Sequence, residues 1–101
     1  MNGAVKHARL SVHCPKCTIT VTWPPSLSAE HKARIAREIR RSQIAGHKLL
    51  AAEFGFSMAE AKALTLHVTQ TAGTCHRCRR PLSRKDDVIV CEMCRSANLD
   101  W

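Results

Sequence analysis

The 101 residues are enough for one ordinary domain, but only 4% of them are aromatic although 45% are hydrophobic. So few bulky side chains leave an apolar core short of material, and we expect the fold to need another source of stability. The 16 Lys and Arg outnumber the 8 Asp and Glu, and the formal net charge of +8 favours phosphate or acidic protein surfaces as partners. No apolar stretch approaches the length of a transmembrane helix, so we expect no membrane partner.

The first ten residues contain Lys6 and Arg9 before any apolar run can form, so we expect no signal peptide. We therefore expect a cytoplasmic protein, in which thiols stay reduced and Cys-x2-Cys pairs hold metal more often than disulfides. Residues 9–13 and 18–23 alternate apolar and polar side chains, which predicts two short strands. The turn between them is Cys-Pro-Lys-Cys, with cysteines at 14 and 17. A strand, a Cys-x2-Cys turn and a second strand, in this order, resemble the first half of a zinc finger.

Two thiolates do not complete a metal shell, so Cys14 and Cys17 need further ligands. We expect a histidine to complete it, and His31, in the first turn of the next predicted helix, is our first choice. Candidates for the fourth ligand are His7, His47 and His67. Thiol–disulfide exchange is an alternative, because Cys-Pro-x-Cys occurs in oxidoreductases. There the second cysteine lies on a helix, whereas a strand pattern follows Cys17.

A helix is predicted from Ser28, which suits the N-cap position, to about Ser42. Its apolar residues share one stripe, and basic side chains cover much of the remaining surface. Such a surface can follow a nucleic-acid backbone, because each phosphate contact releases counterions. The contacts that we expect from this helix are Arg34, Arg37 and Arg41. The alternative is a solvated face on which Glu30 and Glu38 neutralise Arg34.

Two further helices are predicted on either side of Gly55, because glycine readily takes the left-handed conformation that ends a helix. Ser57 and Glu60 have the spacing of a capping box, which begins the second of them. We expect the two helices to pack through apolar side chains, namely Phe54, Phe56, Met58, Ala61, Leu64 and Val68. Residues 44–64 resemble the helical hairpin in the C-terminal domain of the bacterial ribosomal stalk protein, which reads helix, Gly, apolar, small, apolar, Glu-Ala-Lys.

In the stalk family this hairpin presents basic residues to translation GTPases, and Lys48 and Lys62 match two of those positions. The family's arginine three residues after the first lysine is Ala51 here, and its apolar residue before that lysine is His47. The resemblance covers the hairpin and none of the family's strands. It therefore implies a shared packing unit more than a shared function.

The C-terminal third contains two more Cys-x2-Cys pairs, and their cysteines are Cys75, Cys78, Cys91 and Cys94. This spacing resembles that of a zinc ribbon. The resemblance implies a tetrahedral zinc held by four thiolates and a hairpin between the pairs. A closed shell leaves no position for a substrate, so we expect no enzymatic activity. The alternative is a set of buried or disulfide-bonded cysteines.

Basic residues surround these cysteines, and we expect Arg79, Arg80 and Arg84 to contact nucleic acid or another partner. The chain ends at Trp101, which we expect to pack back onto the ribbon. The sequence thus predicts a small α+β metalloprotein: an N-terminal zinc-knuckle β-hairpin in residues 1–25, a three-helix segment in residues 26–70 and a zinc ribbon in residues 71–101.

We expect a non-enzymatic zinc-binding module that contacts nucleic acid or the translation or transcription machinery, including ribosome-related proteins. The alternative is a protein-interaction adaptor that uses the helical hairpin and for which zinc is purely structural. Steep loss of nucleic-acid affinity with rising salt would separate the first from the second.

Overall fold

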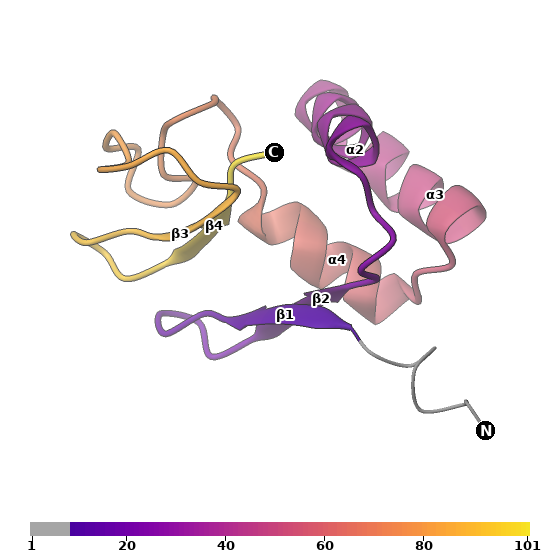
Figure 1. Ribbon diagram of the computed structural model, residues 1–101, viewed down its shortest axis with the longest axis horizontal. Helices are drawn as coiled ribbons and strands as arrows, with labels where there is room; N and C mark the ends of the chain where they lie inside the picture. Colours follow the sequence, from indigo (N-terminus) through magenta and orange to yellow (C-terminus); the bar gives the residue numbers. More distant parts are fainter. Residues whose placement is uncertain (1–8) are drawn as a thin grey trace.

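The computed structural model describes residues 9–101, which form a small α+β fold. Three helices lie between two small antiparallel sheets in chain order (Figure 1). The elements are β1 (Leu10–His13), β2 (Thr20–Trp23), α2 (Ala29–Arg41), α3 (Gln43–Phe54), α4 (Met58–His67), β3 (Val88–Val90) and β4 (Ala97–Leu99). Helix α4 is central, because it contacts α3, β2 and β4. None of the helices in this described range is long and apolar enough to cross a bilayer.

The N-terminal hairpin joins β1 and β2 at the predicted place, with Val12 opposite Val21 and Leu10 opposite Trp23. Alternation along β2 buries Val21 and Trp23, and this face packs toward α4. Leu10, the first residue of β1, stays 48% exposed. The β-branched residues of both strands suit this half-buried pairing.

Helix α2 begins where the sequence predicts, because Ser28 and His31 satisfy each other's backbone N–H groups at 3.1 Å. Ser42 ends α2 and also caps α3, so the two helices follow each other without a loop. Gly46 of α3 lies against Ile39 of α2, and a Cβ atom there would overlap the Ile39 side chain. The glycine therefore allows the two helices to approach closely.

The hairpin of α3 and α4 has the predicted caps: Gly55 has a φ of 71°, and Ser57 and Glu60 form a capping box. Of the predicted packing residues, Phe56, Ala61, Leu64 and Val68 are buried and Phe54 packs against the core. The prediction for Met58 is wrong, since its side chain is 56% exposed. Phe56, just before the N-cap residue Ser57, and Ala61, at the fourth position of α4, are both buried, which is the arrangement of a hydrophobic staple.

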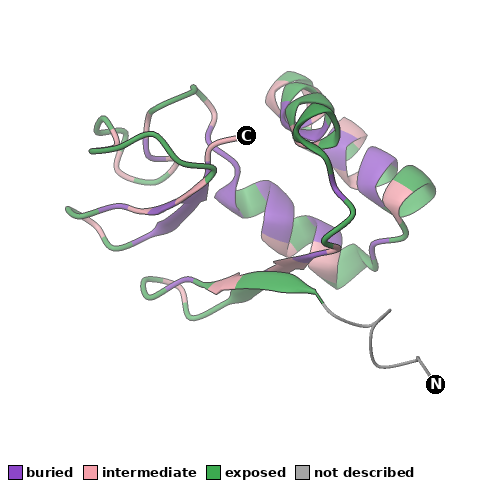
Figure 2. Ribbon diagram, viewed as in Figure 1, coloured by how far each residue is buried: buried purple, intermediate pink, exposed green. Residues whose placement is uncertain are grey.

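The C-terminal segment departs from the predicted hairpin between its cysteine pairs. Strand β3 pairs with β4, which follows the last cysteine, with Ile89 opposite Asn98. Between the pairs, β3 has no partner strand within the described structure, and an isolated bridge joins Pro81 to Thr74, which lies just before the first pair. Strand β4 is buried along its length because it also reaches the end of α4, where the Thr69 N–H donates to the Leu99 carbonyl at 3.0 Å (Figure 2).

Trp101, which we expect to pack back onto the ribbon, also contacts the N-terminal hairpin. Its ring meets Trp23 edge to face, with the centroids 5.4 Å apart. Lys32 of α2 lies 5.4 Å from the Trp101 ring and also pairs with Asp87 at 2.8 Å. The two cysteine-bearing ends of the chain therefore share one core, which is built around α4.

Candidate metal centres

Three turns of the Cys-x2-Cys type, at residues 14–17, 75–78 and 91–94, have the same backbone geometry; we call them the cysteine turns. In each, the N–H of the first cysteine donates to the carbonyl five residues later, and its carbonyl accepts from the N–H four residues later. The residue after each turn has a left-handed conformation: Thr18, Arg79 and Arg95 have φ values of 63°, 67° and 68°. None of the three is a glycine, so the packing around each turn must hold this conformation.

The two C-terminal turns face each other and form a four-cysteine group, made of Cys75, Cys78, Cys91 and Cys94. Their sulfur atoms all lie within 4.8 Å of one another. Across the group, Cys75 Sγ lies 3.6 Å from Cys94 Sγ, and Cys78 Sγ lies 3.6 Å from Cys91 Sγ. All of these thiols are free, so the arrangement can hold one metal ion in a shell of four sulfurs.

A second group, the mixed group, contains Cys14, Cys17 and His67. His67 Nε2 lies 3.2 Å from Cys17 Sγ, and its Nδ1 lies 2.7 Å from the Ala63 carbonyl oxygen. The carbonyl accepts the Nδ1 proton, so Nε2 is left with a free lone pair that faces the sulfur atoms. This group can also hold a metal ion, and His67 is almost fully buried beside it.

The first-choice ligand predicted from the sequence, His31, takes no part in either group. Its ring caps α2, where Nδ1 accepts the Ser28 N–H, and it packs edge to face on Phe54. His47 is likewise absent from both groups, and His7 lies outside the described residues. His67, which the sequence offers only as a candidate fourth ligand, is the histidine that lies with Cys14 and Cys17. Its 50-residue separation from Cys17 gives no local signal.

Strand β4 supports both groups through hydrogen bonds to sulfur. The Ala97 N–H donates to Cys14 Sγ at 3.3 Å, and the Asn98 side-chain amide donates to Cys75 Sγ at 3.5 Å. Asn98 is fully buried and also accepts the backbone N–H of His76 at 2.8 Å. Sequence reasoning missed both residues, because neither is a metal ligand and their strand was not predicted.

Hydrogen bonds and burial shift the pKa values of several of these thiols in opposite directions. Burial opposes ionisation of both Cys14 and Cys75. Hydrogen bonds from N–H groups outweigh it: the Ala97 N–H and the N–H groups of its turn lower the pKa of Cys14 to about 6, and the Asn98 amide and the N–H groups of its turn lower that of Cys75 to about 6. Although a backbone N–H favours its thiolate, burial and neighbouring thiols raise the pKa of Cys78 to about 11. A divalent cation among the sulfurs removes the repulsion between thiolates, so the clustered thiols suit a metal ion.

The predicted contact arginines fall into two sets. Arg34 forms a two-pronged ion pair with Glu53, with both distances 2.8 Å, and Arg41 pairs with Glu38 at 2.8 Å. Arg34 is thus neutralised as in the alternative of a solvated face, but by Glu53 of α3 and not by an ion pair with Glu30 or Glu38. The remaining predicted contacts are exposed and form no ion pair with any residue of the described range: Arg37, Arg79, Arg80 and Arg84.

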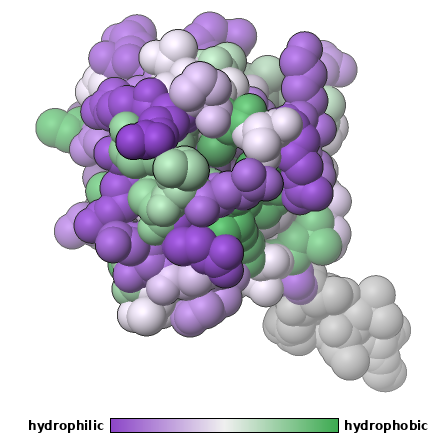
Figure 3. Space-filling view, turned by 90° about the vertical axis from the view of Figure 1, so that its left-hand side faces the viewer, coloured by the Kyte–Doolittle hydropathy of each residue, from purple (hydrophilic) through white to green (hydrophobic). Residues whose placement is uncertain are grey.

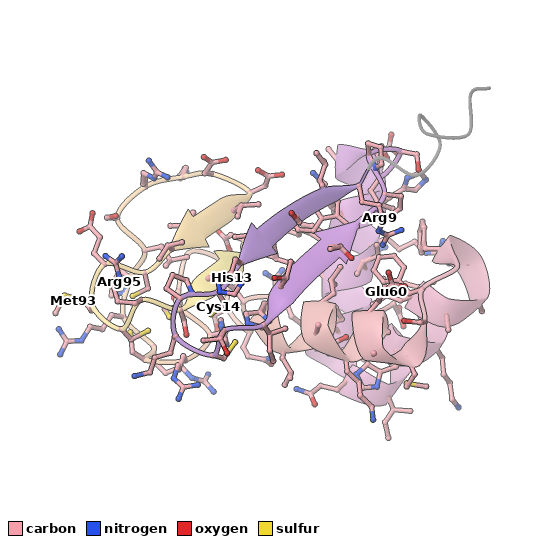
Figure 4. All side chains as sticks on the ribbon, turned by 90° about the horizontal axis from the view of Figure 1, so that it is seen from below. Arg9, His13, Cys14, Glu60, Met93 and Arg95 are labelled. Carbon is pink, nitrogen blue, oxygen red and sulfur yellow. The ribbon has the colours of Figure 1, made fainter. Side chains whose placement is uncertain are left out.

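Hydrophilic side chains cover much of the end of the molecule that carries β3 and β4 (Figure 3). Met93 and Arg95 project from this end, far from the ion pair of Arg9 with Glu60 (Figure 4). Met93 is 63% exposed at the tip of the last cysteine turn. The loop from 79 to 85 adds further exposed basic side chains next to the four-cysteine group.

Cys17 leads directly into Thr18 and then β2, and no helix begins at the first cysteine turn. The helix N-terminus that lowers the thiol pKa in Cys-Pro-x-Cys oxidoreductases therefore has no counterpart beside Cys17. Burial raises the pKa of Cys17, and the lowered pKa of Cys14 comes from N–H groups of its own turn and of Ala97 and not from a helix.

Comparisons with known proteins give no family for this chain: no significant match was found among models of protein families, among curated proteins or among solved structures.

Proposed function

We propose that the protein is a non-enzymatic zinc-binding module, with a C-terminal zinc ribbon, that contacts nucleic acid through the basic surface around the ribbon. Thiolate and imidazole ligands select zinc among the abundant divalent metals, and four closely spaced sulfurs suit its tetrahedral shell. Metal at the four-cysteine group would act as a structural clip, because four protein ligands leave no position for a substrate.

The charge that remains after metal binding favours a nucleic-acid partner. A zinc ion with four thiolates carries a net −2 and one with two thiolates is neutral, so the formal +8 falls to about +6. This balance is sufficient for electrostatic attraction to a phosphate backbone.

One observation carries the proposal: Arg79, Arg80 and Arg84 are exposed and have no acidic partner within residues 9–101. They follow a cysteine turn, whose hydrogen bonds fix the backbone of Arg79 and Arg80. Arginines whose backbone is already ordered lose less conformational freedom on binding a phosphate than arginines in a flexible segment.

The test is the salt dependence of binding to fluorescein-labelled single-stranded RNA and duplex DNA, measured by anisotropy with zinc-loaded protein. A variant with Arg79, Arg80 and Arg84 each changed to Gln should bind more weakly at low salt. Its slope of log affinity against log salt should fall by about 2–3, because three phosphate contacts are lost.

The matched control changes Arg34 and Arg41 to Gln, since these arginines already pair with Glu53 and Glu38. Its slope should change by less than about 1. Weak binding by the wild-type protein at every salt concentration, or equal slopes in all three proteins, would contradict the proposal.

A protein-interaction adaptor that uses the helical hairpin remains the second candidate, and exposed apolar side chains on the hairpin favour it. Ile44, Met58 and Leu66 are 65%, 56% and 53% exposed. Lys48 and Lys62, which match basic positions of the stalk family, are also exposed. An adaptor of this kind would show little affinity for nucleic acid at any salt concentration and would lose its protein partner when these side chains are changed.

A further inference from the structure

The mixed group supplies three ligands, whereas zinc in a closed structural site takes four. The fourth position is therefore either filled by another side chain or open to solvent. A cavity of about 340 Å³ adjoins the group, and Cys17, His67 and His76 are among the residues that line it. His76 lies inside the second cysteine turn, directly after Cys75.

The hydrogen bonds of His76 match those of a metal-bound histidine. Its Nε2 lies 3.0 Å from the Ala97 carbonyl oxygen, which accepts the Nε2 proton and leaves Nδ1 with a free lone pair. His67 has the complementary arrangement, in which the Ala63 carbonyl accepts from Nδ1 and Nε2 is free. Each of the two rings is thus held by a backbone carbonyl and offers one nitrogen for a metal.

The separation of the two rings fits a shared ion. Their centroids are 5.3 Å apart and their planes meet at 66°. Two imidazoles on one tetrahedral zinc, each with a Zn–N bond of about 2.0–2.1 Å, have centroids about 5 Å apart. No other histidine of residues 9–101 forms a ring contact with His67.

We propose that His76 Nδ1 is the fourth ligand of the mixed group, which becomes a closed site of two cysteines and two histidines. His76 lies outside the 4.8 Å group, so its Nδ1 must move closer to the sulfurs when the metal binds, while Nε2 keeps its hydrogen bond to the Ala97 carbonyl. The inference rests on the metal-binding part of the proposed function and is independent of the nucleic-acid part.

This assignment makes the two metal centres neighbours along the chain, because Cys75 would bind one ion and His76 the other. The backbone of His76 is already held by Asn98, whose side chain also donates to Cys75 Sγ. A metal ion bound to Cys75 would fix this sulfur and the Asn98 side chain, and through them the backbone of His76. The two ions should therefore bind with positive cooperativity.

Cobalt(II) in place of zinc gives a direct test, since its visible spectrum reports the ligands and the coordination number. The fully loaded full-length protein should bind two ions per chain, and addition of azide or imidazole should leave its spectrum unchanged. The His76→Ala variant should bind its second ion at least 10-fold more weakly, because the loss of outer partners alone costs that much. Imidazole should then bind the vacated position and restore the wild-type spectrum.

His13→Ala is the matched control, because His13 adjoins Cys14 but belongs to neither group. It should retain two ions and a spectrum that does not respond to imidazole. His76→Cys provides a second variant that keeps four ligands, and its sulfur-to-cobalt absorption should rise by about one sixth as a seventh thiolate is added.

A wild-type spectrum that shifts with azide or imidazole would show an open fourth position and overturn the assignment of His76. Equal affinities of wild type and His76→Ala for both ions would do the same. Failure of the wild-type protein to bind any cobalt or zinc would instead overturn the proposed function itself, so the two failures can be told apart.

Discussion

At the scale of single residues, two histidines differ in their surroundings: His31 caps a helix, and His67 lies with Cys14 and Cys17 in the mixed group. His31 lies at the third position of α2, where its side chain accepts the Ser28 N–H and its own N–H donates to the Ser28 side chain. His67 is the last residue of α4, and its free nitrogen faces Cys17. Because the remaining four cysteines form a group of their own, the sequence predicts a histidine beside Cys14 and Cys17, but the choice between histidines depends on where α4 lies.

We predict that His67→Gln lowers the zinc content from two ions per chain to one, as measured by elemental analysis after gel filtration. The change removes one of the three ligands that the mixed group places together. His31→Ala should retain two ions and lower the free energy of unfolding by about 0.5–1 kcal/mol, because half of a capping box is lost. Two ions in both variants, or one ion in both, would contradict this division of roles.

At the scale of elements, local signals predict the helices and their ends well. Ser28, Gly55, Ser57 and Glu60 act on backbone groups within a few residues, and all four lie where the sequence places them. The three cysteine turns are equally local. By contrast, the pairing of β3 with β4 joins segments whose partners are chosen by tertiary packing, and the sequence of β3 does not specify its partner.

The contact of α2 with α3 depends on the absence of a side chain at Gly46. Gly46→Ala should lower the free energy of unfolding by about 1–2 kcal/mol, because the new methyl group meets the buried Ile39 side chain and this cost exceeds the gain in helix propensity. Urea unfolding of the zinc-loaded proteins measures the difference.

A double-mutant cycle with Ile39→Ala supplies the control for Gly46→Ala. In the Ile39→Ala background, Gly46→Ala should be neutral or stabilise by up to about 1 kcal/mol, since the methyl group then has space. Ala51→Gly, at an exposed position of α3, should cost about 1 kcal/mol in both backgrounds. Additive costs for Gly46→Ala and Ile39→Ala would exclude a direct clash.

At the scale of the whole molecule, a small apolar core joins the two ends of the chain. The core cluster combines Val21 and Trp23 of the first hairpin with Leu64 of α4 and Leu99 of β4. A polar network closes the same region: Arg40 donates to the Thr69 side chain and carbonyl, and Thr69 donates to Asp100 at 2.8 Å. The sequence could not predict that Arg40 bonds Thr69 or that Trp101 packs on Trp23, because the two partners lie about 30 residues apart or more in the chain.

We predict that removal of metal by a chelator dissolves the tertiary structure at both ends and lowers the free energy of unfolding by several kcal/mol. Sheets of two strands, each only three or four residues long, are too small to persist without the ions. The edge-to-face contact of Trp23 with Trp101 gives a signal in near-ultraviolet circular dichroism that should disappear with the metal and return when zinc is added. A signal that survives complete removal of metal would show that the apolar core suffices.

Strand β4 has a consequence for the lengths that this chain can tolerate. Its neighbouring residues Ala97 and Asn98 donate hydrogen bonds to thiols of different cysteine groups, so an insertion of one residue before them would reverse both sides of the strand at once. The exposed loop around residues 83–86 does not position either cysteine group, so its length can change at little cost in folding free energy. Homologous chains should therefore differ in the spacing between their last two cysteine pairs, while the distance from the final cysteine to β4 stays constant.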